Sequence, residues 1–166
     1  GLRLAARRPD LIASAVIMGS SADAEVSVAA MDVVVDIIEQ NGMVPVVEDV
    51  LYFMLGDTTL NDPDRAATKQ RVTKMLESRT PDYAHSVWNI AHRKSVTDEL
   101  ANISVPVLVV AGDEDHTYPP DHLQRIVDGI ADAKYELMTQ TGHVHAVERP
   151  GAVNALLKTH LAETGF

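Results

Sequence analysis

Residues 105–110, VPVLVV, are the stretch that most restricts how this chain can fold. A continuous apolar run of this length, followed at once by Ala111 and Gly112, is typical of a β-strand buried on both faces. Such strands occur in parallel sheets whose two faces are covered by helices. A membrane span would need about 18 consecutive apolar residues, and no stretch of the chain approaches that length. We therefore expect an α/β protein with no membrane segment.

The sequence around this run alternates between strand and helix patterns, as in an open α/β sheet. Residues 13–18 predict a strand that ends at Gly19, and residues 134–138 predict another. Helices are expected at residues 119–130 and 150–162, where prolines stand at the start. The predicted fold class is therefore α/β, with three parallel strands in one sheet.

Residues 22–94 interrupt this alternation, because they contain helix patterns and no good strand pattern. Their helices are expected at residues 28–40, 45–55, 62–78 and 80–93, and glycine or proline marks a boundary of each. We interpret the chain as a core made of residues 1–21 and 95–166, with a four-helix insertion at residues 22–94.

Charge and cysteine content exclude several kinds of function. The 24 acidic and 14 basic residues give a net charge of −10, and an acidic surface repels the phosphates of nucleic acids. We therefore expect no nucleic-acid partner. The chain has no cysteine, which excludes disulfides, thiolate metal sites and a cysteine nucleophile. A cysteine-free chain also fits a reducing compartment, and we predict a cytoplasmic location.

Two polar loops follow two of the predicted strands, at the end of the sheet where open α/β folds bind ligands. Asp113 and Asp115 follow the strand at 105–110, and His143 and His145 follow the strand at 134–138. An aspartate that accepts a hydrogen bond from an imidazole fixes its tautomer and makes the histidine a competent general base. The sequence therefore predicts an Asp–His pair at this edge of the sheet.

Three stretches resemble motifs of the α/β-fold hydrolases. Residues 103–115, ISVPVLVVAGDED, are similar to the family's I-x-x-P-x-L-v-v-x-G-x-x-D, which ends in the acid of the catalytic triad. Residues 142–150, GHVHAVERP, are similar to G-H-x-x-x-x-E-x-P around the family's catalytic histidine. Residues 4–18 resemble the helix and strand that follow the family's nucleophile, and the insertion lies where the family has a helical cap.

The resemblance implies the C-terminal part of an α/β-hydrolase sheet with a four-helix cap, closest to the capped lactonases, esterases and haloperoxidase-like enzymes. It implies that Asp115 is the triad acid, with Asp113 as its competitor. It implies that His143 is the base, with His145 as its competitor. The implied substrate is a small acyl ester or lactone, and neither an organic cofactor nor a metal is implied.

The family's nucleophile motif, G-x-S-x-G, is absent because no two glycines are four positions apart. By the resemblance, the motif precedes Gly1, and the uncapped helix pattern at residues 2–8 suggests that Gly1 is an internal position of a longer protein. A base without a nucleophile has nothing to activate, so we expect the chain alone to be inactive. The alternative is a non-catalytic binding or assembly module that self-associates through an open sheet edge at residues 13–18.

Some other polar side chains have a functional and a structural interpretation. Ser20 and Ser21 follow a predicted strand, but they lack the flanking glycines of a nucleophile turn. Glu148 is expected to be a helix N-terminal charge and not an acid catalyst. A metal site is possible in principle but disfavoured, and its candidate ligands would be His116, His143, His145, Asp113 and Asp115.

Apolar residues at helical spacing mark one face of the predicted helix at 45–55. The simpler interpretation is that this face packs the insertion against the core. The alternative is that three of the residues in the insertion, Leu51, Met54 and Trp88, line a pocket for the acyl group.

Overall fold

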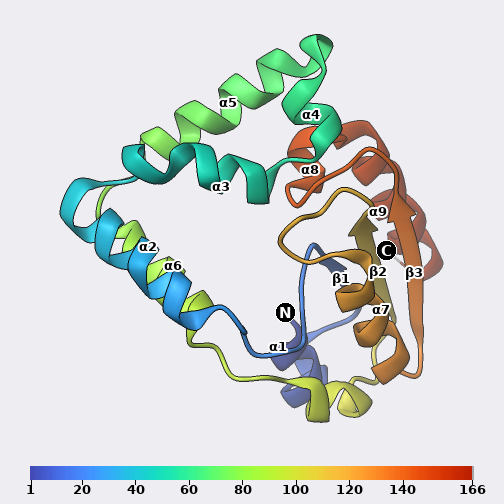
Figure 1. The fold of residues 1–166 in the computed structure, drawn as a ribbon. Coiled ribbons are helices and arrows are strands. Elements are labelled where there is room, and N and C mark those ends of the chain that lie inside the picture. Colours follow the sequence, from blue (N-terminus) through green and yellow to red (C-terminus); the bar gives the residue numbers. More distant parts are fainter. Residues whose placement is uncertain (166) are drawn as a thin grey trace.

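The computed structural model describes residues 1–165, which contain one parallel sheet of three strands (Figure 1). The strands are β1 (Ala15–Met18), β2 (Val107–Gly112) and β3 (Ala133–Met138), and β2 lies between the other two. Every residue of β2 is buried, because the strand is paired on both sides and covered on both faces. The α/β fold predicted from the sequence is confirmed.

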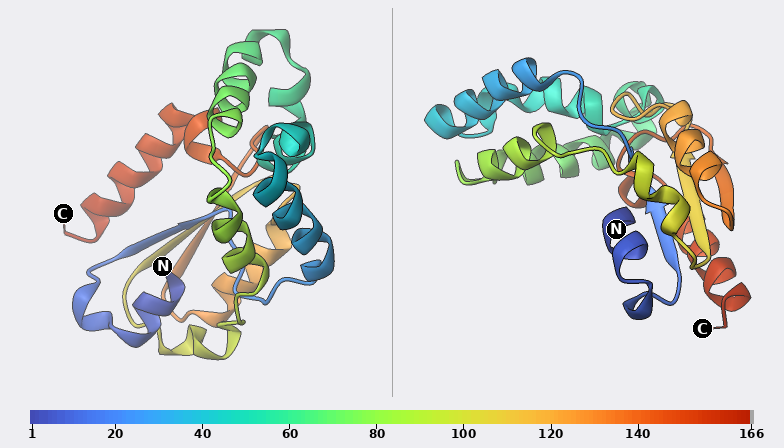
Figure 2. Two further views of the ribbon diagram at one scale, coloured as in Figure 1. Left: turned by 90° about the vertical axis from the view of Figure 1, so that its left-hand side faces the viewer. Right: turned by 90° about the horizontal axis from the view of Figure 1, so that it is seen from below.

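Helices pack on both faces of the sheet, since alternate residues of β2 point to opposite faces. Val107 and Val109 belong to an apolar cluster with α1 (Leu2–Arg7) and α7 (Pro120–Gly129). Leu108 and Val110 face α9 (Pro150–Glu163) instead. The left-hand view of Figure 2 shows α7 and α9 on opposite sides of the strands.

A second group of helices, residues 28–91, stands apart from the sheet and encloses its own apolar cluster (Figure 1). We refer to these residues as the α2–α6 segment. Its helices are α2 (Val28–Asn41), α3 (Val47–Met54), α4 (Asp57–Asn61), α5 (Ala66–Glu77) and α6 (Tyr83–Ala91). The helices α2 and α6 lie side by side. Within residues 1–165, every helix is too short or too polar to traverse a bilayer.

The helices of the α2–α6 segment are interrupted more often than the sequence pattern predicts. The expected helix at 45–55 begins with a 3-10 turn (Val44–Val46), and the expected helix at 62–78 begins with another (Pro63–Arg65). The helix α4 was not predicted, because its residues are mostly poor helix formers. Three further short elements were also not predicted, namely the 3-10 turns Pro9–Leu11 and Thr97–Asn102 and the helix α8 (His145–Glu148).

Truncation of a leucine that packs on the sheet tests where the core lies. Leu123 of α7 is 0% exposed, whereas Leu137 of β3 is 48% exposed. We expect Leu123→Ala to lower the free energy of unfolding by about 2–5 kcal/mol, because it leaves a cavity. The matched change Leu137→Ala should lower it by about 1 kcal/mol or less. Urea unfolding followed by circular dichroism measures both, and equal losses would contradict this packing.

Candidate active site

The loops that follow β2 and β3 touch each other at the carboxyl end of the sheet. A Cβ atom on Gly112 would lie 2.3 Å from the carbonyl oxygen of Thr141, so only glycine allows this approach. The Glu114 amide donates a hydrogen bond to the same oxygen at 3.0 Å. Asp113 joins the loops as well, because its carboxylate accepts from the Thr141 amide at 3.3 Å. Asp113, the competing acid, therefore has a loop contact and not the histidine contact.

Asp115 and His143 form a hydrogen-bonded pair, with 3.0 Å between Asp115 Oδ2 and His143 Nδ1. The Asp115 side chain is 0% exposed. Its other oxygen accepts hydrogen bonds from the Thr117 and Tyr118 amides, both at 2.9 Å. These amides offset the loss of hydration and fix the direction of the carboxylate. A ring nitrogen that faces a carboxylate carries the proton, so Nε2 of neutral His143 is the nitrogen able to accept one.

Gly19, the residue after β1, lies directly against His143. A Cβ atom there would be 3.0 Å from both the Nδ1 atom and the backbone oxygen of His143. The φ angle of Gly19 is +46°, a conformation that glycine adopts without strain. The carboxyl ends of all three strands therefore contribute to the position of the imidazole.

Tyr118 flanks the Asp115–His143 pair, with its ring edge-on to the His143 ring at 5.5 Å between centroids. Its hydroxyl donates to Glu25 Oε1 at 2.5 Å, and the Arg93 guanidinium pairs with Glu25 at 2.7 Å. Burial, reinforced by the hydrogen bond to Glu25, raises the pKa of the Tyr118 hydroxyl above its usual value. Glu25 precedes the α2–α6 segment and Arg93 follows it, so this cluster attaches both connections to the Asp115 loop.

The carboxylates of Glu148 and Glu114 bind the start of α4. Buried Glu148 accepts hydrogen bonds from the Gly142 amide at 2.9 Å and from the Gly56 amide at 3.0 Å. Glu114 accepts from the amide and the hydroxyl of Thr58 at 2.7 and 2.5 Å. The sequence predicted a helix N-terminal charge at Glu148. Its carboxylate does lie at a helix start, but at that of α4 and not that of the helix that follows it in sequence.

The other histidines near the pair have partners of their own. Buried His145 faces the backbone oxygen of His143, with 2.9 Å between that oxygen and Nδ1. His116 faces Asp57 at 3.1 Å and stacks on the Tyr52 ring. Across residues 1–165, no group of three or more His, Asp or Glu side chains is arranged as metal ligands.

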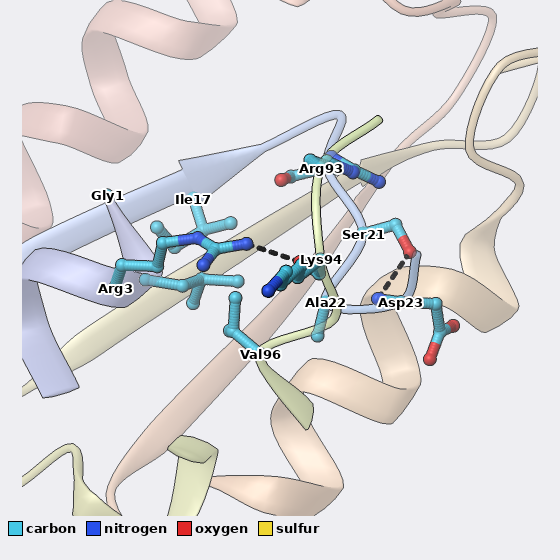
Figure 3. Close-up of a pocket in the computed structure, with 11 residues that line it drawn as sticks. Gly1, Arg3, Ile17, Ser21, Ala22, Asp23, Arg93, Lys94 and Val96 are labelled. Carbon is cyan, nitrogen blue, oxygen red and sulfur yellow. Dashed lines mark hydrogen bonds between the residues drawn. The ribbon is translucent and has the colours of Figure 1, made fainter. Parts of the chain in front are cut away.

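Ser20 and Ser21 line a hollow of about 180 Å³ beside β1 (Figure 3). The Ser21 hydroxyl accepts a hydrogen bond from the Asp23 amide and lies 3.1 Å from His122 Nδ1. The Asp23 carboxylate is 3.9 Å from that same nitrogen. A triad needs the acid and the nucleophile on opposite nitrogens of the imidazole. The arrangement around His122 therefore does not form one.

The three residues predicted for an acyl pocket lie in different surroundings. Leu51 is buried inside the apolar cluster of the α2–α6 segment, and Met54 packs at the margin of that cluster. The Met54 carbonyl accepts a hydrogen bond from the Val144 amide at 3.1 Å, next to His143. Trp88 is half-exposed on α6, where it stacks on His92.

The sequence model of a protein family, described as the alpha/beta hydrolase fold, matches residues 1–150 of the chain. The chain belongs to the alpha/beta hydrolase fold family. No protein of curated function matches it. An esterase from Thermogutta terrifontis has a similar structure, with a TM-score of 0.90 and 19% identity, and the match covers 99% of this chain and 61% of that one.

Two further solved structures are similar. An enol-lactonase from Burkholderia xenovorans LB400 has a TM-score of 0.86 at 20% identity, and the match covers 98% of this chain and 61% of that one. A hydrolase from Pseudomonas aeruginosa PA01 has a TM-score of 0.84 at 23% identity, with 97% and 60% covered. The chain thus spans 60–61% of the length of these three proteins.

The residues that surround the Asp115–His143 pair were not predicted from the sequence. Tyr118, Glu25 and Arg93 are far apart in sequence and follow no periodic pattern, so no local signal could join them. Gly19 was interpreted only as the end of a strand. Its position at the carboxyl end of a parallel strand is a signal for close backbone approach that could have been used.

Alanine at Gly142 tests the contact between the His143 loop and the start of α4. A Cβ atom on Gly142 would lie 2.1 Å from the Gly56 nitrogen. We expect Gly142→Ala to lower the free energy of unfolding by about 1–3 kcal/mol or more, because rigid backbone must move. Gly151, in α9, has no atom within 4 Å of its Cβ position. Gly151→Ala should be neutral or slightly stabilising in the same urea titration. Similar losses for the two variants would contradict the close approach.

Proposed function

We propose that this chain carries the acid and the base of a Ser-His-Asp triad that hydrolyses acyl esters or lactones. The observation that carries the proposal is the 3.0 Å bond between His143 Nδ1 and the fully buried Asp115 carboxylate. This bond leaves Nε2 of His143 as the proton acceptor, which is the state a general base requires. Similarity in fold to an esterase and an enol-lactonase supports this class of reaction.

In the proposed reaction, His143 Nε2 takes the proton of a serine hydroxyl while the serine oxygen attacks the acyl carbon. Asp115 accepts a hydrogen bond from the resulting imidazolium and stabilises its charge. The acyl C–O bond then breaks, and the departing alcohol oxygen receives the proton from Nε2. Water, deprotonated by the same nitrogen, hydrolyses the acyl-enzyme and regenerates the serine.

We place the serine outside this chain, in a segment that precedes residue 1 of a complete enzyme. No G-x-S-x-G motif occurs in the sequence, and the Ser21 hydroxyl faces His122 and not His143. The outer edge of β1 is unpaired among residues 1–165, so its backbone groups are available to a further strand. The greater length of the similar structures also supports this placement.

We further propose that residues 22–94 act as a cap over the site, on a core of residues 1–21 and 95–166. The separate apolar cluster of the α2–α6 segment supports this division. Its contacts with the core converge on the loops of the Asp115–His143 pair. We propose that Met54 contacts the acyl group, since it adjoins Val144, with Leu51 packed behind it and Trp88 at the exposed margin.

Hydrolysis of p-nitrophenyl acetate and butyrate tests the assignment. We expect the 166-residue chain to be inactive, and a longer chain that includes the preceding coding sequence to be active. In the longer chain, His143→Ala should lower kcat at least about a thousandfold, because the base is lost. The control His85→Ala, at an exposed position of α6, should leave kcat unchanged. Full activity of the His143→Ala enzyme would show that the assignment is wrong.

The second candidate is a non-catalytic assembly module, and the open edge of β1 is the observation in its favour. Among the described strands β1 pairs only with β2, so the backbone groups of its other edge are available to a second chain. This candidate predicts concentration-dependent dimers in sedimentation velocity. Val16→Pro, which removes a backbone donor from the strand, should weaken them. A monodisperse monomer at every concentration would exclude this candidate.

A further inference from the structure

His145 is a buried histidine that has no part in the proposed reaction. The residue is 2% exposed, and its Nε2 atom is buried without a hydrogen-bond partner. Its Nδ1 atom lies 2.9 Å from the backbone oxygen of His143. A carbonyl oxygen can only accept, so Nδ1 must carry the proton and Nε2 must be the unprotonated nitrogen.

We infer that His145 is a positioning residue for His143. Its Nδ1–H holds the His143 carbonyl so that the His143 imidazole meets Asp115, and the buried site accommodates the His145 ring in its uncharged form. The inference deepens the proposed function and rests on it for the role of His143.

The peptide groups around His143 show why this one contact matters. The Gly142 amide is held by Glu148, and the Val144 amide is held by the Met54 carbonyl. The carbonyl of His143 completes the set through His145. The His143 carbonyl and the Val144 amide belong to one peptide group, so His145 and Met54 hold opposite sides of that group and together fix its orientation. Without the His145 bond the Met54 contact alone would restrain this peptide, and the backbone that carries the His143 side chain would be less fixed.

Charge on His145 opposes this arrangement. Protonation would place a second N–H at the buried Nε2 atom, where the structure offers no acceptor. The hydrogen bond to the His143 carbonyl favours the charged form of the ring, as do the carboxylates of Asp115 and Glu148, whereas the His143 imidazole disfavours it. Burial outweighs the hydrogen bond and the two carboxylates together, and it lowers the pKa of His145 below its ordinary value of 6.5.

The sign of the pH dependence follows from this lowered pKa. Below about pH 6.5, the unfolded chain binds a proton at residue 145 that the folded chain resists. The stability that the neutral ring contributes is therefore complete above that pH and is lost as the pH falls. The unfolding equilibrium constant should rise by up to about tenfold per pH unit in this window, until the folded form is protonated as well.

Two amide substitutions distinguish the effect of the His145 N–H group from the effect of the side-chain volume. In His145→Asn, the side-chain amide nitrogen is bonded to Cγ, as Nδ1 is in histidine, and it does not titrate. In His145→Gln, the amide nitrogen lies one atom further out, nearer the place of Nε2. The side chain of His145→Leu has no N–H group.

The measurement is NMR of the imidazole nitrogens and protons of His143, recorded on the 166-residue chain. These signals report directly whether the Nδ1–H of His143 is bonded to Asp115.

We expect the wild-type chain to show a His143 Nδ1–H signal protected from solvent exchange at about pH 8 and weakened at about pH 5. His145→Asn should keep the signal at both pH values, and His145→Gln and His145→Leu should lose it at both. Urea unfolding of His145→Asn should lack the acid-dependent loss that the wild type shows. If the leucine variant fails to fold, the comparison of the wild type with His145→Asn still decides.

Three results would overturn the inference, namely an unchanged His143 signal in His145→Leu, loss of the signal in His145→Asn, and equal acid sensitivity of wild type and His145→Asn. The control Asp115→Asn separates this failure from that of the proposed function. If Asp115→Asn leaves the His143 signal unchanged, the pair does not exist in solution and both ideas fail. If the NMR results agree with the inference but the longer enzyme does not hydrolyse esters, only the proposed function fails.

Discussion

The burial of one charged carboxylate, that of Asp115, is the constraint on which the rest of the site depends. A carboxylate with 0% exposure is tolerable only if hydrogen-bond donors replace its water. Two of these donors are backbone amides of its own loop, and the third is His143 Nδ1. The shape of the loop after β2 and the position of the loop after β3 are therefore fixed by the same anion.

Glycine makes this convergence possible. Gly19, Gly112 and Gly142 follow or end the three strands and their loops, and a Cβ atom on any of them would approach another loop to 3.0 Å or less. The loops that hold Asp115 and His143 can thus pack with their backbones in contact, and carboxylate side chains bind backbone amides between them. Glu148 binds the amides of Gly142 and Gly56 together, which extends the network from the sheet to α4.

The sequence predicted those features that have a local signal or that follow from strand direction. The apolar run at residues 105–110 predicted the central strand, and parallel strand ends brought Asp115 and His143 to one edge of the sheet. The helix α4 could not be predicted, because its residues are mostly poor helix formers and its first amides bind Glu114 and Glu148, which are distant in sequence. The contact of Tyr118 with Glu25 was equally hidden, because 93 positions separate the two residues in the chain.

The same residues hold both the α2–α6 segment and the Asp115–His143 pair in place. At one end, Glu25 and Arg93 join both connections of the segment to Tyr118, whose amide binds Asp115. At the other end, α4 is bound to the loop of His143 through Glu148. A rotation of the segment against the sheet would have to break charge-assisted hydrogen bonds at both ends, and these are among the stronger polar contacts in proteins. The position of the helical segment and the geometry of the acid–base pair are therefore coupled.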